Sequence, residues 1–220
     1  MEPHASTASR ADALADHALP HPRPPEVVEL AQALIQTRQT ILPKRLIAPG
    51  PDAEQTQAIL AAAAHAPDHH ELLPWRFILV PQAARERLAE AFGAALIERD
   101  ASATPEQVAQ AREKAHRAPL LLLAVVRLRD GDAEIEPHER IVSAGCAIQN
   151  LLLMAHAQGF GGALTSGKAL ASAPLRALFA LSDDEQALCF VNIGSVDKAR
   201  AMRVRPAPGA YVSELAAQQL

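Results

Sequence analysis

Apolar positions recur at helical spacing along much of the chain. Val27 and Leu30 share one face of a predicted first helix, and Leu88, Phe92 and Leu96 form the buried face of a later one. The same periodicity, with caps and prolines as boundaries, predicts further helices over residues 52–66, 85–99, 104–118, about 137–158 and near 172–179.

Two of these helices begin with a capping box. Asp52 is followed three positions later by Gln55, and Thr104 by Gln107, so that side chains and backbone N–H groups satisfy each other at the first turn. Pro105 at the first helical position strengthens the second signal.

Apolar runs of strand length lie between the helices, at residues 77–80, 120–126 and 188–196. The run at 120–126 is apolar on both faces, as in a strand covered by helices on both sides. Strands separated by whole helices predict a mixed α and β domain with helices flanking one sheet. Residues 203–206 are expected to trail out as an extended arm.

A helix of small residues runs into a glycine segment at residues 143–162. Ala144, Gly145 and Ala147 carry almost no side chain, so that a partner helix or a planar ligand can lie against that face. The glycines at 159–162 are expected to allow unusual dihedrals and to expose N–H donors. A buried central helix with a glycine cap explains the same pattern.

Composition narrows the class of protein. The chain has 220 residues, 49% hydrophobic and 21% charged, which suits one soluble domain over residues 26–220. A net charge of −4 argues against a nucleic-acid surface, and no apolar run reaches the roughly 20 residues of a membrane span. The proline-rich residues 1–25 are expected to form a disordered N-terminal extension.

The termini and cysteines favour a cytoplasmic protein. The first residues lack the basic and apolar segments of a secretory signal. Cys146 and Cys189 fall on a predicted helix and strand, where buried free thiols are expected rather than a disulfide.

Several chemistries are excluded by the residues around the candidate groups. Ser166 lacks the glycine two positions earlier that a nucleophile elbow needs. Pro67 interrupts the turn that would align His65 with His69, so that a polar loop rather than a metal site is expected. The glycines at 159–162 follow a helix and miss the dinucleotide-binding spacing.

One combination remains open. Arg38 near the end of the first helix, with Arg203 and Arg205 in the arm, would neutralise a phosphate if the three converge, although each alone is most simply a surface residue. Backbone N–H groups near residues 161–167 would face the edge of a ring. Together these features suit a planar phosphorylated cofactor.

The order of motifs is similar to the short, single-domain branch of the FMN-dependent nitroreductase family. The motifs are Ile-Gln-Thr-Arg-Gln at 35–39, Ala-Pro-Asp-His at 66–69, Pro-Trp-Arg-Phe at 74–77, Ser-Ala-Gly-Cys-Ala at 143–147, Gly-Phe-Gly-Gly at 159–162 and Thr-Ser-Gly at 165–167. The resemblance spans about residues 26–212. It implies an α+β fold with a central, mostly antiparallel sheet flanked by helices, and a homodimer that exchanges its C-terminal arm and holds FMN at the interface.

The resemblance also assigns site residues. FMN would contact Thr37, Arg38, Gln39, His65, His69, Leu164, Thr165, Ser166, Gly167, Arg203 and Arg205. The region linked to the nicotinamide cofactor would be Ala157, Gln158, Gly159, Phe160, Gly161 and Gly162. No side chain is expected to be catalytic, because FMN carries the electrons, and no metal is expected.

The function that this resemblance implies is ping-pong transfer of hydride from NADH or NADPH to nitroaromatic, quinone or related small-molecule acceptors. The chain departs from the family pattern at Thr37, Gln39, Leu164 and Thr165, where relatives carry Arg, Ser, Trp and Arg. These departures motivate an alternative, a flavin-binding or regulatory protein without significant turnover.

Overall fold

The computed structural model describes residues 24–129, 131–198 and 203–215. The chain divides into two units, the first ending at Gln36 and the second beginning at Thr37. Helix α1 (Pro24–Thr37) belongs to the first unit except for its last residue, and its apolar Val28, Leu30 and Ile35 are exposed. The expected disorder covers residues 1–25. Residues 24 and 25 instead begin α1, and residues 1–23 lie outside the described residues.

The second unit is built on a five-stranded sheet in the order β1-β5-β3-β2, with β4 also paired to β5. All pairs of these strands are antiparallel, and one isolated bridge, Thr40 to Gly162, is parallel. The mostly antiparallel sheet is therefore confirmed. The strands are β1 (Leu46–Ile47), β2 (Trp75–Leu79), β3 (Leu120–Arg127), β4 (Gly161–Thr165) and β5 (Glu185–Val196).

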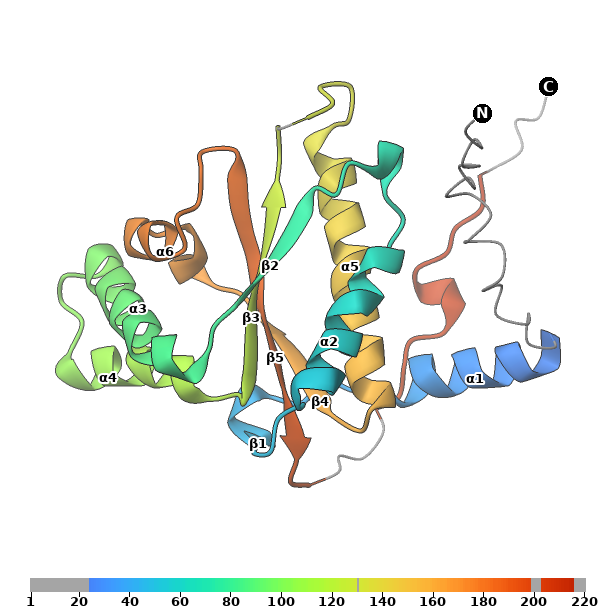
Figure 1. Cartoon of the computed structure of the whole chain (residues 1–220), viewed down its shortest axis with the longest axis horizontal. Helices are drawn as coiled ribbons and strands as arrows, with labels where there is room; N and C mark the ends of the chain where they lie inside the picture. Colours follow the sequence, from blue (N-terminus) through green and yellow to red (C-terminus); the bar gives the residue numbers. More distant parts are fainter. Residues whose placement is uncertain (1–23, 130, 199–202, 216–220) are drawn as a thin grey trace, which may run out of the picture. The chain divides into compact units, whose positions relative to one another are not determined.

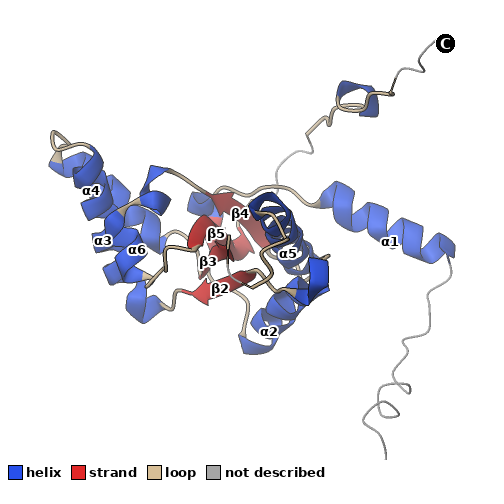
Figure 2. Cartoon of the chain, turned by 90° about the horizontal axis from the view of Figure 1, so that it is seen from above, coloured by secondary structure: helices blue, strands red, loops and turns tan. Residues whose placement is uncertain are grey.

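Helices cover both faces of this sheet (Figures 1 and 2). Helices α2 and α5 pack together on one side, and α3 packs with α4 and α6 on the other. Both predicted capping boxes are present, at Asp52 and at Thr104. The helices of the second unit are α2 (Ala53–Ala62), α3 (Arg85–Arg99), α4 (Pro105–Glu113), α5 (Pro137–Ala157) and α6 (Ala173–Leu178).

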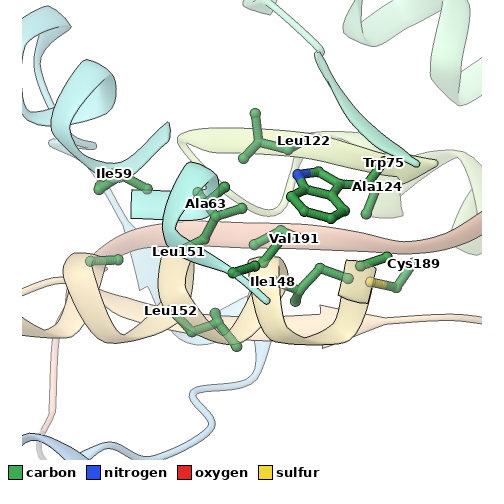
Figure 3. Packing of buried hydrophobic residues seen from close by; sticks show 14 of the residues in the cluster. Ile59, Ala63, Trp75, Leu122, Ala124, Ile148, Leu151, Leu152, Cys189 and Val191 are labelled. Atoms are coloured by element: carbon green, nitrogen blue, oxygen red, sulfur yellow. The ribbon is translucent and has the colours of Figure 1, made fainter. Parts of the chain in front are cut away.

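The central strand β3 explains why the core has two halves. Leu122, like its alternate neighbours, belongs to the apolar cluster that contains α5 residues, whereas Leu121 belongs to the cluster on the α3 side. Every residue from Leu121 to Val126 is buried, as the two-faced apolar run predicts. Figure 3 shows Trp75 and Leu151 packed in the α5 half of the core.

The small-residue face of α5 confirms one of the two explanations of the pattern, a buried central helix. Ala144 and Ala147 are 1% and 0% exposed and pack in the chain's own core together with Ile59 of α2, which leaves no space for a planar ligand against them. A Cβ atom at Gly145 would meet nothing within 4 Å. Only this other side of the helix stays open in the described chain.

The glycines after α5 serve two purposes. Gly159 has φ +86° and ends the helix, with its N–H donating to the carbonyl of His156 and the N–H of Phe160 donating to Ala155, a Schellman motif. Gly161 and Gly162 do not adopt unusual dihedrals, contrary to expectation. They lie in β4, a strand that the sequence did not predict, where a Cβ atom would come within 2.5 Å of Val196 and 2.9 Å of Leu152.

Two strands begin earlier than predicted, at Trp75 and Glu185 instead of residues 77 and 188. Charged residues at the start of each strand, Arg76 and Glu185, interrupt the apolar pattern from which the strands were predicted. Arg76 donates to both oxygens of Glu185 at 2.6 and 2.9 Å, which satisfies the two groups across the sheet. Helices α2 and α4 end earlier than predicted, and each continues as a short 3₁₀ turn.

Both cysteines are free, and burial differs between them. Cys189 is 6% exposed, and this burial raises the pKa of its thiol to about 11. Cys146 is only half-buried, so that the expectation of two buried thiols is half right. Among the described residues, no helix is long and apolar enough to cross a membrane.

Candidate functional site

A cavity of about 270 Å³ lies where the chain enters its second unit. Because Arg38 is its only charged lining residue among those described, we refer to it as the Arg38 cavity. It is lined by Thr37, Arg38, Gln39, Ile41, Leu152, His156, Gly159, Phe160, Gly161, Gly162 and Val196. The structure thus joins the predicted phosphate segment to the glycine segment after α5.

A second arginine, Arg205, lies close to Arg38 of this cavity. The side chain of Arg205 donates to the backbone carbonyl of Arg38 at 3.5 Å, and neither arginine has an acidic partner within the described residues. Burial, and then the nearby charge of Arg205, lowers the pKa of Arg38 from its ordinary value. An anion placed here would gain charge-assisted hydrogen bonds and would relieve this repulsion.

His156 also lines the cavity, although no motif in the sequence pointed to it. Its Nε2 lies 2.7 Å from the hydroxyl oxygen of Thr37, so that the two side chains share a hydrogen bond. His156 stands in the last turn of α5, directly before the glycine segment. Its position near the glycine segment was the one sequence feature that could have drawn attention to His156.

The end of β4 presents backbone donors. The side-chain amide of Asn192, 3% exposed, donates to the carbonyl of Ala163 and to the hydroxyl of Thr165, which fixes this strand beside β5. The next two residues, Ser166 and Gly167, are exposed. Within the described chain their backbone N–H groups donate no hydrogen bond, so that they are available to a ligand.

These two residues line a second, larger cavity of about 490 Å³ between α3, α4 and the sheet. We call it the α4 cavity. Its lining residues are Pro43, Phe92, Leu96, Arg99, Gln107, Gln110, Ala111, Lys114, Arg117, Leu121, Thr165, Ser166, Gly167, Lys168, Ala169, Leu170, Phe190 and Asn192. Phe92 and Leu96 are half-buried rather than buried as expected, because they form its wall.

The predicted histidines lie in neither cavity. His69 is exposed and its Nδ1 lies 3.0 Å from Glu139, whereas His65 is exposed in the 3₁₀ turn after α2. The hydrogen bond from His69 lowers the pKa of the Glu139 carboxyl. No group of three metal-ligating side chains gathers among the described residues.

The remaining predicted residues lie apart from the cavities. The side chain of Leu164 is 46% exposed, and Arg203 and Ala157 are exposed as well. The Oε1 atom of Gln158 is buried and has no hydrogen-bond partner within the described residues. A single described chain therefore groups the predicted cofactor residues into separate clusters.

Comparisons with known proteins agree with one another. A family model described as "Nitroreductase family" matches residues 35–195. A protein of Haemophilus influenzae named "Putative NAD(P)H nitroreductase" is 36% identical over 165 residues, which cover 75% of this chain and 88% of that protein.

Solved structures show the same fold at low identity. The nitroreductase-like family protein from Bacillus cereus aligns with a TM-score of 0.70 at 18% identity, over 83% of this chain and 94% of that one. The NADPH:FMN oxidoreductase from Vibrio harveyi complexed with NAD⁺ aligns with a TM-score of 0.63 at 18% identity, over 85% of this chain and 77% of that one.

Proposed function

Because this chain belongs to the nitroreductase family, we propose that it is an FMN-dependent oxidoreductase that uses NADH or NADPH to reduce nitroaromatic, quinone or related electrophilic acceptors. The observation that carries the proposal is the closeness of two arginines, Arg38 in the lining of the cavity and Arg205 bonded to its backbone, neither with an acidic partner among the described residues. Such a pair fits a phosphate group.

The phosphate end of FMN would be held at the Arg38 cavity. Arg38 and Arg205 would supply charge, and Thr37 and Gln39 would supply a hydroxyl and an amide. The hydroxyl of Thr37 is oriented by His156. Arg203, two residues before Arg205, would add a further positive charge from the same arm.

The ring end would be held by backbone donors. Ser166 and Gly167 are exposed, and their N–H groups have no partner within the described chain. They directly follow Thr165, whose hydroxyl is held by Asn192 at the end of β4. We place His65 and His69 beside the ring in the assembled protein, as the family resemblance implies. The chain's own groups therefore bind and orient, and we assign no proton transfer to any side chain.

When bound, FMN would supply the hydride chemistry, accepting electrons from the nicotinamide cofactor and delivering them to the acceptor in separate half-reactions. The chain would hold first the nicotinamide cofactor and then the acceptor against the bound flavin ring. We place the nicotinamide cofactor along residues 157–162, as the resemblance implies.

We further propose a cytoplasmic homodimer with the sites at its interface. The outer side of α5 exposes Ile141 at 39% and Val142 at 64%, next to the open position at Gly145. The described residues 203–215 are exposed throughout, which supports an arm exchanged between subunits. A second copy would supply the cofactor contacts that one chain leaves apart.

The absorbance spectrum of the purified protein tests this function. We expect a yellow protein that NADH or NADPH bleaches without oxygen and that menadione or a nitroarene recolours. Replacing Arg203 and Arg205 together by alanine should release FMN while the dimer stays folded, whereas Arg87→Ala on exposed α3 should retain FMN. A colourless protein that refuses added FMN would refute the proposal.

The alternative is a flavin-binding or regulatory protein without turnover. One observation favours it: the hydroxyl of Thr165 accepts a hydrogen bond from Asn192 and thus serves the sheet, at a position where relatives carry arginine. Flavin that stays oxidised under both nicotinamide cofactors would select this alternative.

A further inference from the structure

The α4 cavity has an apolar wall. Its apolar lining residues come from α3, β3, β5 and the 3₁₀ turn after β4: Phe92, Leu96, Leu121, Phe190 and Leu170. The rings of Phe92 and Phe190 meet edge to face with centroids 5.5 Å apart. A volume of about 490 Å³ with aromatic walls suits a small flat molecule rather than a chain of protein or nucleic acid.

The polar side of the same cavity is basic. Gln107 and Gln110 lie on α4, Lys114 begins the 3₁₀ turn that follows this helix, and Arg99, Arg117 and Lys168 complete the rim. None of the described lining residues is acidic. The chain as a whole carries a net charge of −4, so that this local excess of cations is opposite to the average of the molecule.

Most of these cations lack an ionic partner. Arg117 is held by Glu113, but Arg99, Lys114 and Lys168 form no ion pair within the described residues. Hydrogen bonds from Ser102 lower the pKa of Asp100, and hydrogen bonds from Arg117 lower the pKa of Glu113. The charges of the sequence neighbours Arg99 and Lys114 help to lower these two pKa values. Three unpaired cations around an apolar slot would attract a negative group on the ligand.

The cavity also contains the backbone donors at the end of β4. Ser166 and Gly167 line it together with Thr165, so that a molecule in the cavity lies against the segment that would hold the edge of the flavin ring. This arrangement would place the cavity occupant where electrons are delivered.

We propose that the α4 cavity binds an aromatic molecule that carries a carboxylate or an equivalent negative group, and that this is the class of electron acceptor. The second clause depends on the proposed oxidoreductase function, whereas the first depends only on the cavity. The apolar wall holds the ring, and Arg99, Lys114 and Lys168 select the charge.

Calorimetric titration of the purified protein tests the binding. The probes are 4-nitrobenzoate and its neutral methyl ester. We expect 4-nitrobenzoate to bind about tenfold or more tightly than the ester, which corresponds to about 1.4 kcal/mol. The triple variant R99Q/K114Q/K168Q should lose this preference while its affinity for the ester changes less than about twofold, because the wall is intact.

Arg87→Gln is the matched control, because it removes an exposed cation from α3 outside the cavity. It should keep the preference of the wild type. Equal binding of the two probes, an unchanged preference in the triple variant or an equal loss of both probes would overturn the proposal.

Turnover separates this proposal from the function on which it depends. With NADH or NADPH as donor, kcat/KM for 4-nitrobenzoate should fall about tenfold in the triple variant, and that for the ester should hold. Selective binding without any turnover would refute the oxidoreductase function and the acceptor role, and would support the binding site. Turnover without charge selectivity would refute the cavity proposal alone.

Discussion

At the scale of single residues, the two buried arginines of the described chain, Arg85 and Arg140, donate to backbone carbonyls. Arg85 is 1% exposed and donates to the carbonyls of Val80, Ala115 and Pro119 at 2.9, 2.7 and 3.2 Å. It thereby ties the end of β2 and the start of β3 to α3. Lys114 and Arg117 of the basic rim lie close in sequence to the carbonyls that Arg85 holds. Arg85 therefore helps to fix the shape of the α4 cavity although it does not line it.

Replacement of Arg85 by methionine should therefore be costly. Methionine fills similar volume but leaves three buried carbonyls without these donors, and we expect the free energy of unfolding to fall by about 2–4 kcal/mol. Urea denaturation measures it. Arg87→Met, exposed on the same helix, should change it by less than about 0.5 kcal/mol. Similar effects of the two variants would contradict this account.

Glu185 gives a pH-dependent prediction. The hydrogen bonds from Arg76 hold the pKa of this buried carboxyl below its ordinary value. Its stabilisation is therefore complete above about pH 4.3, the unfolded value, and is lost as the pH falls through the lower folded value. Glu185→Gln should cost about 1–3 kcal/mol at pH 7.

The cost should shrink as the pH falls below 4, because the wild-type carboxyl is then protonated too. Urea unfolding of the wild type and of Glu185→Gln at pH 7 and at pH 3 measures this change in cost. Glu113→Gln removes an exposed ion pair with Arg117 and should cost less than about 0.5 kcal/mol at either pH. A cost for Glu185→Gln that is independent of pH would count against the ionic contribution.

At the scale of elements, local signals predicted the helices and failed where a contact is distant. The capping boxes at Asp52 and Thr104 and the bounds 85–99 are correct because caps and periodicity are local. Strand β4 was missed because Gly161 and Gly162 have no side-chain pattern. They are small because Val196 and Leu152 pack against their Cα atoms, contacts that no local pattern reveals.

The candidate site follows the same division. Arg38, Arg205 and the glycine segment were chosen from the sequence, and the structure brings Arg205 and residues 159–162 to Arg38. The basic rim around Lys114 was not anticipated, because α4 reads as an ordinary polar helix. Its role depends on facing the half-buried wall of α3 across a cavity, which is a property of packing.

Gly159 supplies a prediction about an element boundary. Its φ of +86° ends α5, and a Cβ atom there would meet nothing within 4 Å, so that the cost of alanine is that of the backbone alone. We expect Gly159→Ala to lower the free energy of unfolding by about 1 kcal/mol. Gly209→Ala, also in open space but without positive φ, should have almost no effect.

At the scale of the whole molecule, the proposed dimer explains apolar surface that one described chain leaves exposed. Val142 on α5 is 64% exposed, compared with 39% for Ile141 and 36% for Met154 on the same helix. Because the outer side of α5 also carries the open position at Gly145, we expect this surface to be covered by a second copy.

Val142→Glu should convert the dimer to a monomer and release FMN, because a charge in an apolar interface is not solvated. Sedimentation velocity and the flavin absorbance measure the two effects. Ile97→Glu is the control, since Ile97 is exposed to 51% on α3, away from this surface. A Val142→Glu protein that stays dimeric would place the interface elsewhere.

The anchored end of β4 has a consequence for the exchange of backbone amide hydrogens with solvent. Asn192 anchors the strand, yet the amides of Ser166 and Gly167 at its end are exposed and carry no internal bond in the described chain. They should therefore exchange deuterium quickly although the end of the strand next to them is hydrogen-bonded to Asn192. A ligand docking there meets donors already ordered by folding, and slowed labelling at these two amides would report its arrival.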